Sequence, residues 1–196
     1  MRTLRLQSGA TMMEVLVSIL IVVIGLLGLA GLQARINLSE MESFQRAQAL
    51  VLLQDMVDRI SANRKNAANY VTVDPLGTGN NLGACYGLFD DVLDKCQWNN
   101  SLLGAAEEAN SQKVGGMIGA RGCVAQITAT PPAQYTVSVV WQGINPTIAP
   151  RDPCGQGRYG NDATRRVVSA NIIIGCLQNN PVTGACMTKP ASPPLR

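Results

Sequence analysis

The chain has 196 residues, 16 basic and 13 acidic side chains, a formal net charge of +3, and no histidine. This length allows one domain plus an extension. Scattered arginines and an aromatic content of 4% provide neither the basic patch nor the stacking surface of a nucleic-acid-binding protein. Without histidine there is no Ser-His or Cys-His catalytic pair, and no phosphate loop or dinucleotide fingerprint occurs. We therefore expect no enzyme, no cofactor and no nucleic-acid partner.

The most informative stretch is the apolar run at residues 15–32, which follows Ser-Gly-Ala-Thr-Met-Met-Glu at residues 8–14. Eighteen residues without a charge are nearly long enough to cross a hydrocarbon layer as a helix. Glu14 is the only charge between Arg5 and Arg35. A carboxylate in a membrane segment is a functional candidate that requires a partner. The alternative is that it snorkels to the interface and has no further role.

The small residues before the run indicate how the N-terminus is processed. In a secretory signal peptide the cleavage site follows the apolar region, whereas here the natural break, between Gly9 and Ala10, precedes it. Cleavage after Gly9 would remove a basic leader, residues 1–9, and leave Ala10 as the new N-terminus. Two alternatives are a Sec signal cleaved after Ala30 and an uncut single-pass anchor.

This arrangement resembles the class III leader of type IV pilins and type II secretion pseudopilins. The resemblance implies that a prepilin peptidase cleaves after Gly9, methylates the amine of Ala10 and requires Glu14, the fifth residue of the mature chain. It also implies that Glu14 pairs with the N-terminal amine of the previously added subunit, and we expect this pair to set the axial register of assembly. Ala10 differs from the phenylalanine that is usual at the first mature position.

We expect the hydrophobic segment, residues 10–34, to act as a transmembrane and polymerisation helix. Gly25, Gly28 and Gly31 recur at every third position within it and form a smooth stripe. Such a stripe lets neighbouring helices approach closely in lipid. A generic flexible membrane helix is the alternative interpretation.

Residues 35–62 are predicted to form the amphipathic half of the same helix, packed on a head. One long helix is the first prediction, and the alternative is a second helix that starts after a break near residues 33–38. Asp55 and Arg59 have opposite charges one turn apart. The expected buried face follows spacings of three and four residues and consists of Phe44, Ala47, Leu50, Val51, Leu53, Val57 and Ile60.

The remaining residues, 63–196, are expected to form a globular head that ends in a mobile tail. Residues 70–120 are loop-rich, with a short helix predicted near residues 102–110. Asp90 and Asp91 are interpreted as part of a solvated loop, and Arg165 with Arg166 as an ordinary strand edge. Alternating apolar side chains predict three strands, at residues 123–130, 135–141 and 168–174. A long helix on a small antiparallel sheet is an α+β, pilin-like architecture.

Six cysteines all lie after residue 84, in the part of the chain that would lie outside a bacterial inner membrane. An even number in an oxidising compartment indicates disulfides. A zinc site is the weaker alternative, because the chain has no histidine and no C-x2-C pair, and we expect no metal. Fifteen pairings are possible, of which the geometry of a three-stranded meander favours Cys85 with Cys96, Cys123 with Cys154 and Cys176 with Cys186.

Residues 14–17 and 24–33 closely resemble the minor pilins of the PilV family, over about the first 35 residues of the chain. The resemblance implies a low-abundance subunit that joins other minor pilins to prime type IV pilus assembly, at the pilus tip, and that supports twitching motility and adhesion. The implied partners are other minor pilins, the major pilin, the pilus assembly platform in the inner membrane and a tip adhesin.

The resemblance also implies a location. Before assembly the chain would cross the inner membrane of a Gram-negative bacterium once, with a periplasmic head, and after assembly it would belong to the pilus, or fimbrium. Two other functions stay open. One is a minor pseudopilin of a type II secretion system, and the other is a membrane-tethered periplasmic binding module that never polymerises.

Overall fold

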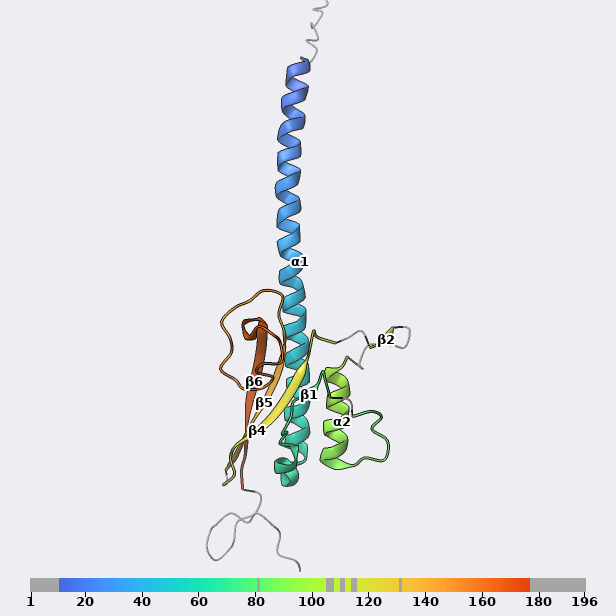
Figure 1. The fold of residues 1–196 in the computed structure, drawn as a ribbon, viewed down its shortest axis with the longest axis vertical. Helices are drawn as coiled ribbons and strands as arrows, with labels where there is room; N and C mark the ends of the chain where they lie inside the picture. Colours follow the sequence, from blue (N-terminus) through green and yellow to red (C-terminus); the bar gives the residue numbers. More distant parts are fainter. Residues whose placement is uncertain are drawn as a thin grey trace, which may run out of the picture. The chain divides into compact units, whose positions relative to one another are not determined.

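The structure is a computed structural model that describes residues 11–80, 82–104, 108–109, 112–113, 116–130 and 132–176. The chain divides into two compact units, Met1–Glu42 and Ser43–Arg196. One α-helix, α1 (Met12–Ala62), contributes to both units without a break, which confirms the prediction of one long helix. In the second unit, α1 packs on a small antiparallel sheet stapled by disulfides, so the fold is the α+β, pilin-like fold that the sequence predicts (Figure 1).

Both ends of α1 carry local signals that favour a helix. The backbone N–H of Glu14 donates to the carbonyl oxygen of Thr11 (3.0 Å) and to its Oγ1 (3.3 Å), which satisfies a donor that a helix start leaves unpaired. Glu14 in the first turn and Arg59 in the last turn complement the helix dipole. After Ala62 the chain tightens into a short 3₁₀-helix, η1 (Arg64–Tyr70).

The main sheet has four antiparallel strands in the order β1-β4-β5-β6. All three strands predicted from alternation are present, and β6 starts three residues earlier than predicted. A second, two-stranded sheet and the first strand of the main sheet were not predicted. The strands are β1 (Leu76–Gly77), β2 (Glu108–Ala109), β3 (Gln112–Lys113), β4 (Arg121–Thr128), β5 (Ala133–Gln142) and β6 (Arg165–Ile174).

The head also contains a helix at a different position from the predicted one. The helix is α2 (Asp90–Leu102), whereas the prediction was residues 102–110, part of which forms β2. Asp90 and Asp91 are in its first turn rather than in a solvated loop, and Asp91 lies 3.1 Å from the ammonium group of Lys95. Acidic side chains at a helix N-terminus are stabilising.

The predicted buried face of α1 is partly wrong. Of that set only Leu53 and Ile60 are buried, while Phe44 and Val51 are 60% and 68% exposed. The sheet covers a neighbouring face, because the residues that α1 buries are Gln45, Ala49, Leu53, Met56 and Ile60. Apolar side chains surround this part of the helix, so periodicity alone could not select the side that meets the sheet.

Two of the predicted disulfides are present. Cys85 is bonded to Cys96 and Cys123 to Cys154, with Cα atoms 5.8 and 5.9 Å apart. The first ties the loop before α2 to that helix, and the second ties β4 to the long loop between β5 and β6. Cys176 also takes part in a disulfide, and its predicted partner, Cys186, lies outside the described residues.

A close contact between β4 and α2 gives the first prediction. A Cβ atom on Gly122 would lie 2.2 Å from the ring of Trp98. That ring is fully buried and donates from Nε1 to the carbonyl oxygen of Leu52 at 2.8 Å, so it cannot move away freely. We expect Gly122→Ala to lower the free energy of unfolding by about 1–3 kcal/mol, measured by urea unfolding of the full chain in detergent micelles.

The matched control is Gly116→Ala, because the nearest atoms to a Cβ there lie at ordinary contact distance, 3.5 Å or more. When Trp98 is first replaced by phenylalanine, Gly122→Ala should lower the free energy of unfolding by less than it does in the original chain, because phenylalanine lacks the ring atoms that clash. Equal stability of Gly122→Ala and the original chain would contradict the contact.

Candidate functional site: the uncovered apolar helix

The N-terminal part of α1 carries an apolar surface that no described residue covers. None of its most apolar 18-residue window is buried, and the mean hydropathy of that window is 2.9. Leu27, for example, is 69% exposed. At 1.5 Å per residue, 18 residues extend about 27 Å, close to the roughly 30 Å of a bilayer core. By length and composition this helix can span a membrane once, although a signal sequence has the same properties.

Glu14 is the one charged side chain in the first turns of this helix. Its backbone is engaged within the helix, since its carbonyl oxygen accepts a hydrogen bond from Ser18 Oγ at 2.7 Å. Among the described residues its carboxylate has no hydrogen bond or ion pair. The carboxylate can therefore receive a cation from another group or molecule. Gly9 and Ala10, the predicted cleavage site, lie outside the described residues.

The three glycines of the predicted packing stripe have no contact that explains them inside the described chain. A Cβ atom built on Gly25, Gly28 or Gly31 would meet no other atom within 4 Å apart from the helix's own backbone. Glycine in a helix interior costs about 1 kcal/mol relative to alanine. The space above each glycine is open, which is the surface that a closely packed neighbouring helix requires.

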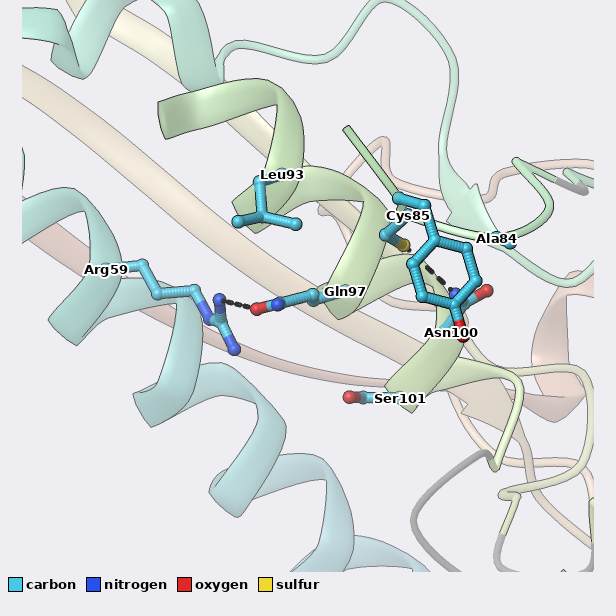
Figure 2. Close-up of a pocket in the computed structure, with 8 residues that line it drawn as sticks. Arg59, Ala84, Cys85, Leu93, Gln97, Asn100 and Ser101 are labelled. Carbon is cyan, nitrogen blue, oxygen red and sulfur yellow. Dashed lines mark hydrogen bonds between the residues drawn. The ribbon is translucent and has the colours of Figure 1, made fainter. Parts of the chain in front are cut away.

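A second surface was not predicted, namely an open pocket of about 650 Å³ between α2 and the head part of α1. Figure 2 shows Arg59 of α1 reaching Gln97 of α2 across it. The lining residues are Arg59, Ala84, Cys85, Tyr86, Leu93, Gln97, Asn100 and Ser101. Arg59 also binds Asp55 at 2.9 Å and Asp94 at 2.8 Å. Although burial opposes its charge, these carboxylates raise the pKa of the Arg59 guanidinium. The positive charge of Arg59 is therefore compensated by carboxylates within the head. The pocket lies where two helices of the head pack together.

The same carboxylate of Asp94 also holds η1 in place. It accepts a short hydrogen bond from the hydroxyl of Tyr70, which in turn accepts one from Asn63 Nδ2 at 3.2 Å. Burial and the contact with Asp94 raise the pKa of Tyr70 to about 12. The neutral phenol is therefore the form that the fold favours, because a phenolate would face a carboxylate.

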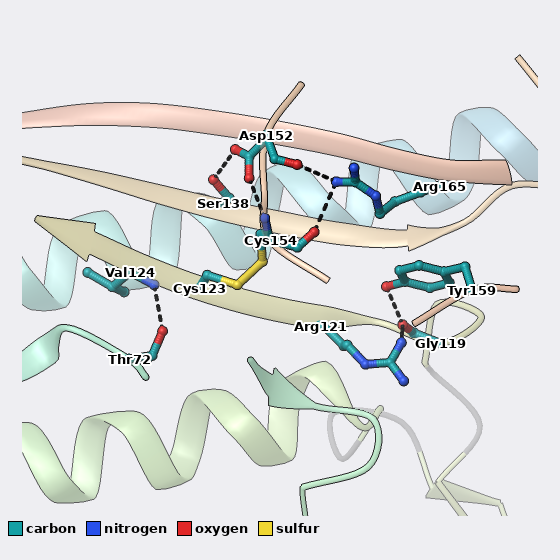
Figure 3. The surroundings of a disulfide bond; sticks show 10 residues. All are labelled: Thr72, Gly119, Arg121, Cys123, Val124, Ser138, Asp152, Cys154, Tyr159 and Arg165. Atoms are coloured by element: carbon teal, nitrogen blue, oxygen red, sulfur yellow. Dashed lines mark hydrogen bonds between the residues drawn. A yellow bond between two sulfur atoms is a disulfide. The ribbon is translucent and has the colours of Figure 1, made fainter. Parts of the chain in front are cut away.

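On the outer face of the sheet, Arg165 fixes the long loop between β5 and β6. Its side chain is fully buried, and it donates to the carbonyl oxygens of Pro150, Asp152 and Cys154 at 2.6 to 3.0 Å and to both carboxylate oxygens of Asp162 at 2.8 Å. Figure 3 shows it turned toward Asp152 and Cys154, beside the disulfide to Cys123. The interpretation of Arg165 as an ordinary strand edge is wrong, because its partners lie in a loop that sequence spacing does not place.

Within the described residues, no group of three or more histidine, cysteine, aspartate or glutamate side chains could hold a metal ion. Comparison with protein-family models, with curated proteins and with solved structures found no match. The uncovered apolar helix with Glu14 and its glycine stripe is therefore the feature from which a function can be argued.

The contact between Tyr70 and Asp94 predicts a loss of stability in alkali. Below pH 10, the ordinary pKa of a tyrosine side chain, the phenol is protonated in both the folded and the unfolded chain, and the stabilisation is fully present. Between pH 10 and about 12 the unfolded chain releases this proton while the folded chain retains it, so the free energy of unfolding should fall as the pH rises.

Urea unfolding of the full chain in detergent micelles, measured from pH 9 to pH 12, tests this dependence. Tyr70→Phe should be less stable at pH 9 and should show a flatter fall with pH. The matched control is Tyr86→Phe, because Tyr86 is 92% exposed and its removal should leave the slope unchanged. An unchanged slope in Tyr70→Phe would show that Tyr70 does not titrate in this range.

Proposed function

We propose that this chain is a minor pilin of the PilV type, which joins other minor pilins to prime type IV pilus assembly. The observation that carries the proposal is an uncovered apolar helix whose first turns hold one carboxylate, Glu14, with no partner among the described residues. A membrane anchor alone explains the apolar surface. It does not explain a carboxylate placed where a cation from a neighbouring molecule is needed.

In this proposal, a prepilin peptidase cleaves after Gly9 and leaves a methylated amine on Ala10. An ionised carboxylate moved into hydrocarbon without a partner costs several kcal/mol. Pairing of Glu14 with the amine of the previously added subunit removes most of that cost. The pair forms at only one axial offset between two helices, so the same interaction that makes membrane extraction favourable also fixes the register.

The glycine stripe supports the same function. Lipid chains are as apolar as leucine side chains, so helices in a membrane or in a fibre core associate through close packing. Gly25, Gly28 and Gly31 leave open space on α1, which allows the helix of another pilin to approach the backbone. The disulfide-stapled head would then face solvent, where it contacts other minor pilins or a tip adhesin.

The main test is Glu14→Ala in cells that lack the original gene. We expect the variant to remain in the inner membrane and to be absent from sheared pili, with twitching reduced to the level of the deletion strain, because both the peptidase and the subunit contact require this carboxylate. Glu14→Asp should retain part of the activity, because it keeps a carboxylate at this position on a side chain that is shorter by one methylene. N-terminal sequencing and mass measurement of membranes and sheared fibres separate processing from assembly.

The matched control is Glu40→Ala, since Glu40 is an exposed glutamate on the same helix outside the apolar run. Normal pilus incorporation of Glu14→Ala would contradict the proposal. An N-terminus of the original chain at Met1 or Gly31 would also contradict it, and would indicate a tethered or secreted module. A deletion strain that loses exoprotein secretion while it keeps twitching would point to a pseudopilin.

The stripe has a test of its own. Gly28→Leu fills the space through which a neighbouring helix would approach, so we expect at least a tenfold lower amount of this chain in sheared pili at an unchanged amount in the membrane. Ala30→Leu adds a side chain of the same size on the opposite side of the helix and should have a smaller effect. Equal effects of the two substitutions would favour the interpretation of a generic membrane helix.

A further inference from the structure

The main sheet of the head has two edges, which differ in how far other parts of the described chain protect them. At the β4 edge, Val124 accepts a hydrogen bond from the N–H of Thr72 at 2.9 Å and donates its own N–H to Thr72 Oγ1 at 3.0 Å. β1 covers the neighbouring residues of β4, and the pairing of β4 with β5 shifts register between Gln126 and Thr128. Covering and irregular pairing are both means by which proteins protect a sheet edge.

The β6 edge has no such protection in the described part of the chain. β6 pairs with β5 over ten residues without a register shift. Over residues 167–174 its sequence contains neither proline nor a charged residue, the features that most often block an edge. A long, regular and unblocked edge strand is a template for another strand.

The register identifies which backbone groups are available. In an antiparallel sheet, successive residues direct their N–H and C=O groups to opposite neighbours. Since Val124 points away from β5, Cys123 and its partner Ser138 exchange hydrogen bonds, and Val137 of β5 therefore faces Ala170 of β6. The residues of β6 whose backbone groups point outward are Val167, Ser169, Asn171 and Ile173. These groups have no hydrogen-bond partner among the described residues.

An apolar flank lies beside this edge. Val168 and Ala170 lie on the face of β6 that meets α1 and are only partly buried. Val57 of α1 is also only partly buried. Leu50 is 48% exposed. The core of the head therefore reaches the β6 edge without being closed there.

The position of α2 shows on which side of α1 this flank lies. α2 contacts the side of α1 that carries Leu52 and Arg59, and it also contacts β1, the strand farthest from β6. Helical periodicity places Leu50 and Val57 on the opposite side. In the head, β6 and α2 accordingly lie on opposite sides of α1 (Figure 1).

We propose that the outer edge of β6 binds an extended segment of a partner protein by strand addition. The added strand would pair with the free N–H and C=O groups of β6. Because side chains alternate along a strand, every second one would fall on the flank of Leu50, Val57, Val168 and Ala170. The occupant is therefore a segment with alternating apolar residues, and backbone pairing supplies affinity while the flank supplies specificity. This inference does not depend on the chain being a pilin.

A second copy of the chain fits this edge less well. Antiparallel pairing of two β6 strands makes the two α1 helices run in opposite directions, although both would have to enter one membrane. Parallel pairing turns over one sheet and places the polar side chains of Ser169 and Asn171 on the apolar flank. A strand of a different protein avoids both conflicts.

The experiment uses the full chain in detergent micelles and a synthetic ten-residue peptide of alternating valine and threonine with lysine at both ends. We expect binding by fluorescence anisotropy, together with slower amide hydrogen exchange at Val167, Ser169, Asn171 and Ile173. Two further peptides of the same sequence carry N-methyl groups on alternate amides, one at the odd and the other at the even positions. One of the two should bind and the other should not. Equal binding of both methylated peptides would overturn strand addition.

Two variants test the two parts of the site. Ser169→Pro removes an outward N–H that has no partner among the described residues, and Leu50→Lys places a charge on the flank without touching the backbone. Each should weaken peptide binding at least tenfold, while Val51→Lys, on another side of α1, should not. If Ser169→Pro proves unfolded by circular dichroism, Leu50→Lys against Val51→Lys still decides.

Three outcomes would overturn the proposal. The first is no binding of the alternating peptide at millimolar concentration. The second is equal binding by Leu50→Lys and Val51→Lys. The third is protection of the same four amides by raised chain concentration alone, with a doubled mass in sedimentation, which would make a second copy the occupant.

Discussion

The packing of α1 on the sheet is the interaction on which the rest of the head depends. Ala49, Met56 and Ile60 are fully buried there, and each large apolar side chain removed from water contributes roughly 1.5–3 kcal/mol. The other elements of the head attach to the same helix. Trp98 of α2 donates to a carbonyl of α1, and the Arg59 side chain joins α1 to Asp94. Without the helix, the sheet would lose one face of its core and α2 would lose its anchor.

That same helix is incomplete as a soluble element. Its part in the head finds an apolar partner within the chain, whereas none of its most apolar window does. Such a surface is stable only in lipid or against another protein. A function for this chain therefore has to explain an interface that is long, apolar, smooth at its glycines and charged at one residue. The proposed function, in which a pilin helix moves from lipid into a fibre, would account for all four properties together.

Alternation was sufficient to predict all three long strands, because Tyr135, Val137 and Val139 of β5 keep a strict period of two on the buried face. It could not select the buried face of α1, which is apolar on several sides. α2 escaped prediction because its buried side includes Asn99, whose Oδ1 accepts from the N–H of Gly77. Arg165 escaped because burial of a guanidinium depends on carbonyl oxygens that only the folded loop brings together. Glu14 and the glycines lie on an uncovered stretch of helix, so their local surroundings could be predicted from sequence, while their roles stay predictions.

Like the apolar helix, the head leaves one surface uncovered among the described residues, namely the outer edge of β6. Thr72, β1 and the Cys123 disulfide all act on β4 or on the outer face, and the Arg165 contacts fix the loop above them. None of these reaches the edge of β6 that carries Ser169 and Asn171. A chain selected to remain solitary would gain from a charge or a proline there, at small cost to its own fold. Its absence, beside an apolar flank that is not closed, is what we would expect of a subunit whose sheet is completed by another protein.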